Sequence, residues 1–292
     1  MESANNFFMI KSTIKPIWLK NIDILVNILR ASLKSFIILI FFTVCVILTL
    51  ILRIVTLITV KWFYIKINTK YIIRPLSRSL LFIAGVKLNR PKDVDILNAI
   101  IVSNHWGYLD SLVLMALSPC IVISNVDVRQ MPFIGRIMML MGFVFVDRQN
   151  NRSIPIVLEK ATNLLNQTNL NVAFFPEGGT GDGFELKKFN SSFFELAFTT
   201  KKNVVPVVIQ IETINKETPN QDNINQVVFH NSRGNIIIHL LRLLQLKSIG
   251  IKFTILPQIS YYEIYSKYLS RKKICEIAEK KFSDFLDKNK RF

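Results

Sequence analysis

Seventeen consecutive residues without a charge, Phe36–Leu52, dominate the N-terminal part of this sequence. After Arg53 the apolar character resumes and continues to Val60. As a helix, residues 36–52 would reach about 26 Å and residues 36–60 about 37 Å, whereas the hydrocarbon of a bilayer is about 30 Å thick. The run therefore predicts a membrane-embedded helix with the Arg53 side chain reaching toward the interface. A cleaved signal peptide is not expected, because the run begins late and no small-residue cleavage site follows it.

Basic residues flank this run on both sides, so the flanking charge does not orient the helix. They are Lys11, Lys15, Lys20, Arg30 and Lys34 before it, and Lys61, Lys66, Lys70, Arg74 and Arg78 after it. A spanning helix and a helix that dips into one leaflet both fit this pattern. Trp62, beside Lys61, is interpreted as an interfacial anchor.

The composition is apolar and basic at the same time. The chain has 37 Lys and Arg against 20 Asp and Glu, a net charge of +17, and 50% hydrophobic residues. An intrinsically disordered chain is excluded by this apolar content, and a disulfide framework by the presence of only 3 cysteines. The combination favours a protein held on anionic lipid over a nucleic-acid binder.

Beyond residue 98, short apolar runs alternate with helical stretches. The expected strands are residues 99–103, 120–124, 142–146, 171–175, 204–210 and 251–256, and the expected helices include 108–117, 153–167 and 191–201. This alternation predicts an α/β fold, a mostly parallel mixed sheet flanked by helices, preceded by the N-terminal membrane-embedded helical segment. Pro206 lacks an amide donor, so its strand is expected at an edge or bulged.

Three regions follow from this pattern. Residues 1–90 form a basic, membrane-embedded helical region, residues 91–260 the α/β domain, and residues 261–292 a basic amphipathic helix. The expected strand phenylalanines, including Phe174 and Phe175, are interpreted as core residues rather than as an acyl-chain groove.

Polar residues collect where several apolar runs end. They are Asn104 and His105 with Asp110 five positions on, the pair Asp147-Arg148, and a loop that begins Glu177-Gly178-Gly179-Thr180. Ligands bind outside the carboxyl ends of the strands in such sheets. A carboxylate on one nitrogen of His105 would leave the other free to take a proton, so Asp110 and His105 are candidates for a general base. The glycine loop suits an anion or oxyanion, and Arg148 an anionic group.

Four ordered blocks resemble the glycerolipid acyltransferase family. Residues 103–110, SNHWGYLD, are similar to its NHxxxxD block, residues 142–148 to a GxxFxxR pattern, residues 175–178 to FPEG, and residues 204–207 to a fourth block. The resemblance implies that His105 is the general base and that Asp110 orients it. It further implies that Asn104, Arg148, Glu177, Gly178, Gly179 and Thr180 bind substrate, with no metal, no cofactor and no acyl-enzyme.

The implied reaction moves a fatty acyl group from acyl carrier protein or acyl-CoA to the hydroxyl of a lysolipid. The expected partners are that lysolipid, the thioester donor and anionic membrane lipid, without nucleic acid, on the cytoplasmic face of the inner membrane. Many members continue FPEG with Thr-Arg-Ser, whereas this chain has GTGDG at residues 179–183, closer to lyso-ornithine-lipid acyltransferases. The acceptor could therefore carry phosphate, as lysophosphatidate does, or a carboxylate.

Two other functions fit parts of the sequence. A non-enzymatic basic adaptor on the membrane surface would use the terminal lysines, and a hydrolase would use water as the acceptor. Trp106, beside His105, is expected at the membrane interface, where a lipid acceptor would enter.

Overall fold

The structure is a computed structural model that describes residues 17–56, 61–89, 96–130, 134–147, 149–150, 152–229 and 235–289. The helices are α1 (Ile17–Val55), α2 (Lys61–Asn68), the π-helix η1 (Thr69–Ile73), α3 (Arg74–Ala84), α4 (Tyr108–Leu117), α5 (Val126–Gln130), α6 (Ile134–Leu140), α7 (Ser153–Thr168), the 3-10 helix η2 (Ser192–Glu195), α8 (Leu196–Thr200), the 3-10 helix η3 (Ile224–Gln226), α9 (Ile236–Gln245), α10 (Tyr261–Ser266) and α11 (Arg271–Lys288). The strands are β1 (Val86–Asn89), β2 (Ile100–Ser103), β3 (Cys120–Asn125), β4 (Val144–Val146), β5 (Asn171–Phe174), β6 (Val204–Ile214) and β7 (Ile249–Ile255).

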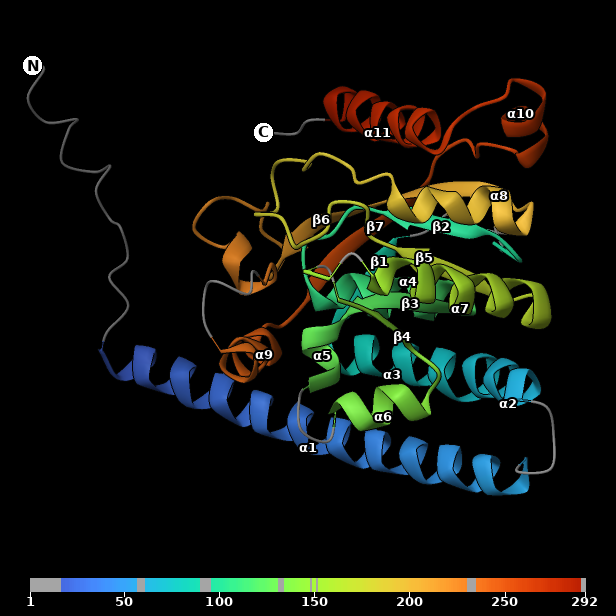
Figure 1. Cartoon of the computed structure of the whole chain (residues 1–292). Helices are drawn as coiled ribbons and strands as arrows, with labels where there is room; N and C mark the ends of the chain where they lie inside the picture. The colour runs from blue at the N-terminus through green and yellow to red at the C-terminus, as the bar shows by residue number, and fades with distance from the viewer. Residues whose placement is uncertain are drawn as a thin grey trace, which may run out of the picture.

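One mixed sheet forms the centre of the molecule, with helices on both faces (Figure 1). The strand order is β1-β7-β6-β2-β5-β3-β4, and β6 with β7 is the antiparallel pair. The remaining neighbours are parallel. The expected α/β class, a mostly parallel mixed sheet flanked by helices, is confirmed.

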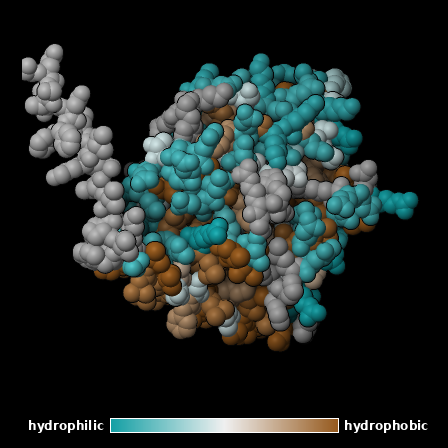
Figure 2. All heavy atoms as spheres, turned by 90° about the vertical axis from the view of Figure 1, so that its left-hand side faces the viewer, coloured by the Kyte–Doolittle hydropathy of each residue, from teal (hydrophilic) through white to brown (hydrophobic). Residues whose placement is uncertain are grey.

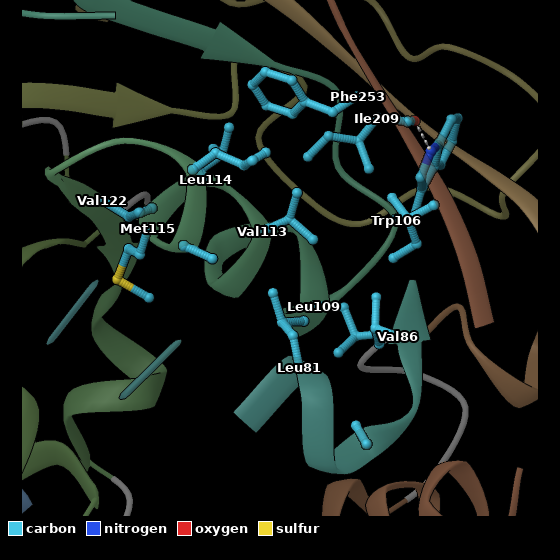
Figure 3. Close-up of a cluster of buried hydrophobic side chains, with 14 of the residues drawn as sticks. Leu81, Val86, Trp106, Leu109, Val113, Leu114, Met115, Val122, Ile209 and Phe253 are labelled. Atoms are coloured by element: carbon cyan, nitrogen blue, oxygen red, sulfur yellow. Dashed lines mark hydrogen bonds between the residues drawn. The ribbon is translucent and has the colours of Figure 1, made fainter. Parts of the chain in front are cut away.

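Two apolar layers pack against the sheet, because successive strand residues point to opposite faces. On one face β2 contributes Ile101, which packs with residues of α3, α4 and α9. Figure 3 shows part of this layer, in which Leu81 and Leu109 lie near each other. On the other face β2 contributes Ile100 and Val102, which belong to the layer formed with α7, α8 and α11. The sheet is therefore buried on both sides, and its polar chemistry is confined to its edges.

Pro206 lies in an interior strand, so the expectation of an edge strand is wrong. β6 pairs with β2 on one side, where Pro206 is opposite Val102, and with β7 on the other. The β6–β7 ladder begins at Val207 opposite Ile255, and the Leu256 amide donates to the Pro206 carbonyl at 2.9 Å. Pro206 is tolerated because it lies where β7 ends, so that its missing donor costs one bond at the limit of the ladder.

The N-terminal apolar run is helical, as predicted, and lies within the longer helix α1 of 39 residues. Its continuation over residues 57–60 falls outside the described part of the chain. The sheet begins earlier than the expected boundary at residue 91, because β1 covers Val86–Asn89 and pairs with β7.

The C-terminal region forms two helices in place of the single helix expected over residues 261–292. The side chains of Ser260 and Ser270 accept hydrogen bonds from the amides of Glu263 and Lys273, so each serine begins its own helix. The apolar side of α11 is buried against the sheet, with Phe282 fully covered. This amphipathic face is therefore part of the core.

Candidate active site

The His105 loop and the glycine loop meet because they follow neighbouring parallel strands. β2 and β5 are paired with Val102 opposite Phe174, and both strands run toward the same edge of the sheet. The Gly181 amide donates to the His105 carbonyl at 2.7 Å, which joins the two loops directly. The structure thus brings together two of the three polar groups expected from the sequence, the group around His105 and the glycine loop.

The His105 imidazole is held by a carboxylate. Its Nδ1 lies 2.9 Å from Oδ2 of Asp110, and the Asp110 side chain is only 5% exposed. The same oxygen accepts hydrogen bonds from the amides of Trp106 and Gly107. Because Asp110 lies in the first turn of α4, its charge is also favoured by the helix N-terminus. Asp110 therefore fixes both the loop and the orientation of the ring.

The second nitrogen of His105 has no hydrogen-bond partner within the described residues. When Nδ1 donates to the carboxylate, Nε2 carries a lone pair and can accept a proton. The His105 side chain is 16% exposed, so solvent or a substrate reaches the ring in part. This arrangement can serve as a general base for a hydroxyl group.

Phe175 forms one wall of the His105 site. Its ring stacks on the imidazole, with centroids 3.9 Å apart and an angle of 10° between the planes. Phe175, expected from the sequence to be a core residue, is indeed buried, but it also restricts the ring of His105. The sequence contained a signal for this position beside His105, because Phe175 directly precedes Pro176-Glu177. Its side chain also points to the opposite face from that of Phe174.

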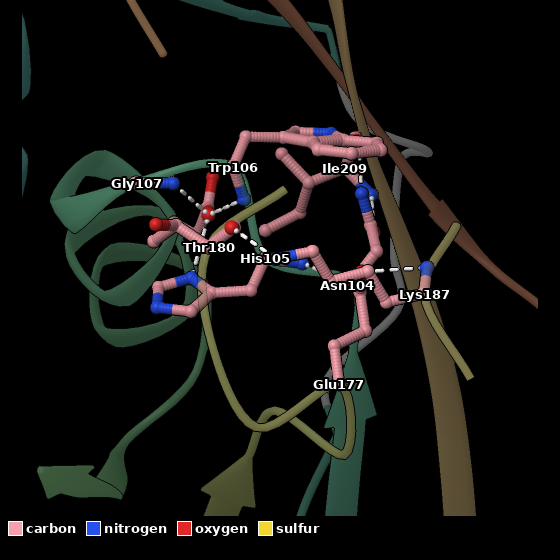
Figure 4. A network of polar contacts seen from close by, with 9 residues as sticks. Asn104, His105, Trp106, Gly107, Glu177, Thr180, Lys187 and Ile209 are labelled. Atoms are coloured by element: carbon pink, nitrogen blue, oxygen red, sulfur yellow. Dashed lines mark hydrogen bonds and ion pairs between the residues drawn. The ribbon is translucent and has the colours of Figure 1, made fainter. Parts of the chain in front are cut away.

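Glu177 binds backbone amides of the chain itself. Oε1 accepts from the His105 amide at 2.8 Å and Oε2 from the Lys187 amide at 3.0 Å, as Figure 4 shows. Burial raises the pKa of Glu177 to about 7, although both amide donors favour the charged form. Glu177 therefore joins the His105 loop to the segment around Lys187, and its contact with substrate stays a prediction.

Asn104 and Trp106 are likewise engaged with the sheet. The Asn104 amide group donates to the Ile209 carbonyl and accepts from the Ile209 amide, each at 2.8 Å, and the residue is completely buried. No part of Asn104 is thus presented to a substrate. Trp106 Nε1 donates to the same carbonyl and the residue is 5% exposed. The expected interfacial position of Trp106 is therefore wrong, because β6 buries the indole.

The glycine loop is the open part of the site. Gly178 is exposed with a φ of 73°, a left-handed conformation that favours glycine, and the space around Gly179 is empty within 4 Å of a hypothetical Cβ. The Thr180 carbonyl accepts from Nζ of Lys187 at 2.7 Å. Gly178 is thus exposed and Gly179 and Thr180 partly exposed, and their contact with a substrate stays a prediction. Arg148 lies outside the described residues.

A second histidine, not singled out from the sequence, lies close to the same loop. The Tyr108 hydroxyl lies 3.0 Å from Nδ1 of His239, and His239 Nε2 lies 3.1 Å from the Asn225 carbonyl. The Asn225 carbonyl can only accept, so Nε2 carries the proton and Nδ1 accepts from the hydroxyl. Burial lowers the pKa of His239 and raises that of Tyr108, which keeps both groups neutral.

Among the described residues there is no group of three or more His, Cys, Asp or Glu side chains that could hold a metal ion. The site therefore consists of an imidazole–carboxylate pair, an aromatic wall and an open glycine loop.

Comparisons with known proteins agree with the motif blocks. Residues 86–210 match the family model described as Acyltransferase. A 1-acyl-sn-glycerol-3-phosphate acyltransferase of Neisseria gonorrhoeae is 27% identical over 126 residues, 43% of this chain and 49% of that protein. A human 1-acyl-sn-glycerol-3-phosphate acyltransferase beta is 33% identical over 111 residues, 37% of this chain and 40% of that protein. The matched segment thus spans about half the length of such relatives.

The same fold occurs in a solved structure. The 1-acyl-sn-glycerophosphate acyltransferase of Thermotoga maritima superposes with a TM-score of 0.59, covers 94% of this chain and 98% of its own, and is 15% identical. At that identity the likeness concerns the fold alone. The four motif blocks lie between residues 103 and 207, inside the matched range. Residues 86–210 are therefore similar to the Acyltransferase family.

Proposed function

We propose that this chain is a membrane-bound O-acyltransferase that moves a fatty acyl group from a thioester to the hydroxyl of a lysolipid. The observation that carries the proposal is the His105 imidazole, with Nδ1 on the Asp110 carboxylate and Nε2 without a partner in the described structure. The names of the relatives, which act on 1-acyl-sn-glycerol-3-phosphate, support a lysolipid acceptor.

In the proposed reaction Nε2 of His105 takes the proton of the acceptor hydroxyl as its oxygen attacks the thioester carbonyl. The resulting tetrahedral intermediate collapses by breaking the carbon–sulfur bond. The thiol then leaves with the proton from His105, so the base is regenerated and no acyl-enzyme forms. Asp110 keeps the ring oriented and stabilises the imidazolium that exists between the two proton transfers.

The oxyanion of the intermediate needs hydrogen-bond donors. The open backbone of Gly179 and Thr180 is a candidate, because it follows Gly178 in its left-handed conformation at the exposed edge of the loop. Arg148, by the family resemblance, would bind the anionic group of the acceptor.

The donor is a thioester of acyl carrier protein or of coenzyme A, and both are anionic. A net charge of +17 favours either donor and an anionic membrane surface. Because such donors are cytoplasmic, the active site would face the cytoplasm at the inner membrane. The acceptor is lysophosphatidate or a lyso-ornithine lipid, and the absence of an arginine after FPEG favours the second.

The test is an acceptor panel with the detergent-solubilised full chain. Each reaction contains acyl carrier protein thioester or acyl-CoA and one lysolipid, and the acylated product is measured by mass spectrometry. We expect product with one acceptor class, and a loss of about 100-fold or more in the His105→Ala variant. The matched control is Tyr262→Ala, at an exposed position on α10.

Three results would contradict the proposal. Near-full activity of His105→Ala would rule out the general base. Release of free fatty acid without acylated lipid would point to a hydrolase. No product with any acceptor, while lipid binding is intact, would favour the non-enzymatic adaptor.

A further inference from the structure

Helix α9 presents an apolar face that no described part of the chain covers. Ile237, Ile238, Leu240 and Leu241 are 63%, 51%, 38% and 44% exposed. Their spacing places them on one side of a helix. The opposite side faces the body of the protein, since Leu243 belongs to the core and His239 contacts Tyr108. A monomer in water rarely exposes such a face without an interaction partner.

This face continues into the exposed side of α1. Figure 1 shows α9 next to the N-terminal half of α1, and Figure 2 shows hydrophobic surface gathered along the lower side of the molecule, where α1 runs. Exposed apolar residues occur along the whole length of α1, among them Leu25, Leu29, Phe36, Ile47 and Ile54. The two helices therefore share one apolar surface.

Two cations of α1, Arg30 and Lys34, point inward and attach α1 to the body of the protein. Arg30 donates to the Gln245 carbonyl at 2.7 Å, and Lys34 donates to the carbonyls of Leu246 and Ala84 at 2.8 and 2.9 Å. These carbonyls lie at the C-terminal ends of α9 and α3, where helix dipoles favour positive charge. Both interactions orient the polar side of α1 toward α9 and leave its apolar side outward.

Contacts between α1 and the body continue toward the other end of the helix. Cys45 packs against the core, and Thr49 donates to the Asn68 side chain of α2 at 3.1 Å. A helix of 39 residues is about 58 Å long, roughly twice the hydrocarbon thickness. If α1 crossed the bilayer upright, the sheet and helices attached along it would enter the hydrocarbon as well. An orientation along the membrane plane avoids this cost.

We propose that α9 is a second membrane-embedded element, which enters one leaflet beside α1 and lies in the membrane plane. Lipid is the occupant that the structure favours, because the α9 face is continuous with the predicted membrane helix. Helix α9 contains no acidic residue, and Arg242 and Lys247 are exposed in and after its last turn, where they suit anionic head groups.

The position of α9 also relates the membrane to the candidate active site. Its inward residue His239 contacts Tyr108, three positions after His105, and the Phe229 amide donates to the Trp106 carbonyl at 3.1 Å. Insertion of α9 would therefore hold the His105 loop next to the leaflet that carries the lysolipid. This last step rests on the proposed function, whereas the insertion of α9 does not.

The experiment measures the depth of α9 directly. In a full-length Cys45→Ala background, Leu241→Cys is labelled with an environment-sensitive nitrobenzoxadiazole dye, because the other two native cysteines are buried. The protein is reconstituted at a low protein-to-lipid ratio in vesicles of phosphatidylethanolamine and phosphatidylglycerol. Quenching by aqueous iodide and by doxyl-labelled lipid is recorded. Tyr262→Cys, 80% exposed on α10, is the matched control.

We expect the dye at position 241 to be quenched several-fold more by doxyl lipid and several-fold less by iodide than the dye at position 262. A second label at Ile237→Cys controls for a local effect of the substitution or the dye at position 241. It should give the same quenching pattern as the label at 241. Equal iodide quenching at all three positions would overturn the proposal. Shielding from iodide that rises with protein density, without quenching by doxyl lipid, would show that a second copy covers α9, and would also overturn it.

The two proposals fail independently. Reconstituted His105→Ala protein should give the same quenching pattern as the parent, even with acyl transfer abolished. Lipid quenching at α9 in a protein with no transferase activity would support the membrane element and contradict only the proposed function.

Discussion

Tyr108 contacts one histidine, His239, and follows another, His105, by three residues. The surroundings of the two imidazoles differ in charge. His105 pairs Nδ1 with the Asp110 carboxylate and leaves Nε2 without a partner in the described structure. His239 pairs Nδ1 with the Tyr108 hydroxyl and Nε2 with the Asn225 carbonyl. One imidazole lies beside a carboxylate, and burial lowers the pKa of the other.

The difference shows that the partners of an imidazole, together with its burial, decide what it can do. A carboxylate compensates an imidazolium, whereas a buried phenol does not. Two engaged nitrogens also leave no site for an incoming proton. His239 is therefore suited to connect α9 with the loop that contains His105, and His105 alone of the pair is suited to proton transfer.

The largest effect is expected from removing the charge beside His105. In Asp110→Asn the carboxylate no longer compensates the imidazolium, and the side-chain amide group cannot satisfy all the donors that now meet at Oδ2. We expect kcat for acyl transfer to fall by about 10²–10⁴-fold. The matched control is Asp127→Asn on α5, an exposed carboxylate that should change kcat little. A fall of kcat below about threefold in Asp110→Asn would show that the carboxylate does not distinguish His105 from His239 in proton transfer.

The sequence could predict this pair because its geometry is local. The five-residue spacing between His105 and Asp110 places the carboxylate in the first turn of α4, which begins at Tyr108 as expected. The strands were also predictable, since runs of β-branched and aromatic residues fit the pleated, buried surface of a sheet. These elements account for most of the sheet.

Features that depend on strand order could not be predicted. The position of Pro206 in an interior strand follows from where β7 ends, and the engagement of Glu177 follows from the neighbourhood of β2 and β5. The contact of Tyr108 with His239 joins segments 131 residues apart. No local pattern encodes such pairings, because they form only when the chain is folded.

A second prediction concerns Glu177, which joins the His105 loop to Lys187. Its pKa is raised from 4.5 to about 7 in the folded protein, so the folded state binds the proton more tightly than the unfolded state. Stability from this group is thus complete below pH 4.5 and is lost as the pH rises to about 7, by no more than about 3 kcal/mol. Glu177→Gln should not show this loss.

The measurement is denaturant unfolding at pH 5 and pH 7.5. The control is Glu159→Gln, an exposed position on α7 that should keep the pH dependence of the parent protein. If Glu177→Gln also kept it, the folded carboxyl would not have the raised pKa, and the two amide bonds would outweigh its burial.

A third prediction tests the aromatic wall of His105. Phe175→Leu keeps an apolar side chain but removes the ring that stacks at 3.9 Å. Such ring contacts contribute about 0.5–1.5 kcal/mol, so we expect kcat to fall by about two- to tenfold with KM for the acceptor unchanged. The control is Phe174→Leu, at the last residue of β5, which precedes Phe175 and faces the other layer. A similar fall of kcat in both variants, measured where both are folded, would show that Phe175 acts only as a core residue and not through its contact with His105.

The smallest effect on turnover is expected at His239. In His239→Gln the amide can still contact Tyr108 and Asn225, so kcat should stay within about threefold of the parent. Stability should respond instead. Because burial lowers the folded pKa of His239, the unfolded state takes up the proton first as the pH falls below 6.5, and the parent loses stability there. The variant should lose less between pH 6.5 and 5, measured by thermal unfolding. A fall of kcat as large as that in Asp110→Asn would mean that His239 takes part in proton transfer, and would remove the contrast between the two imidazoles.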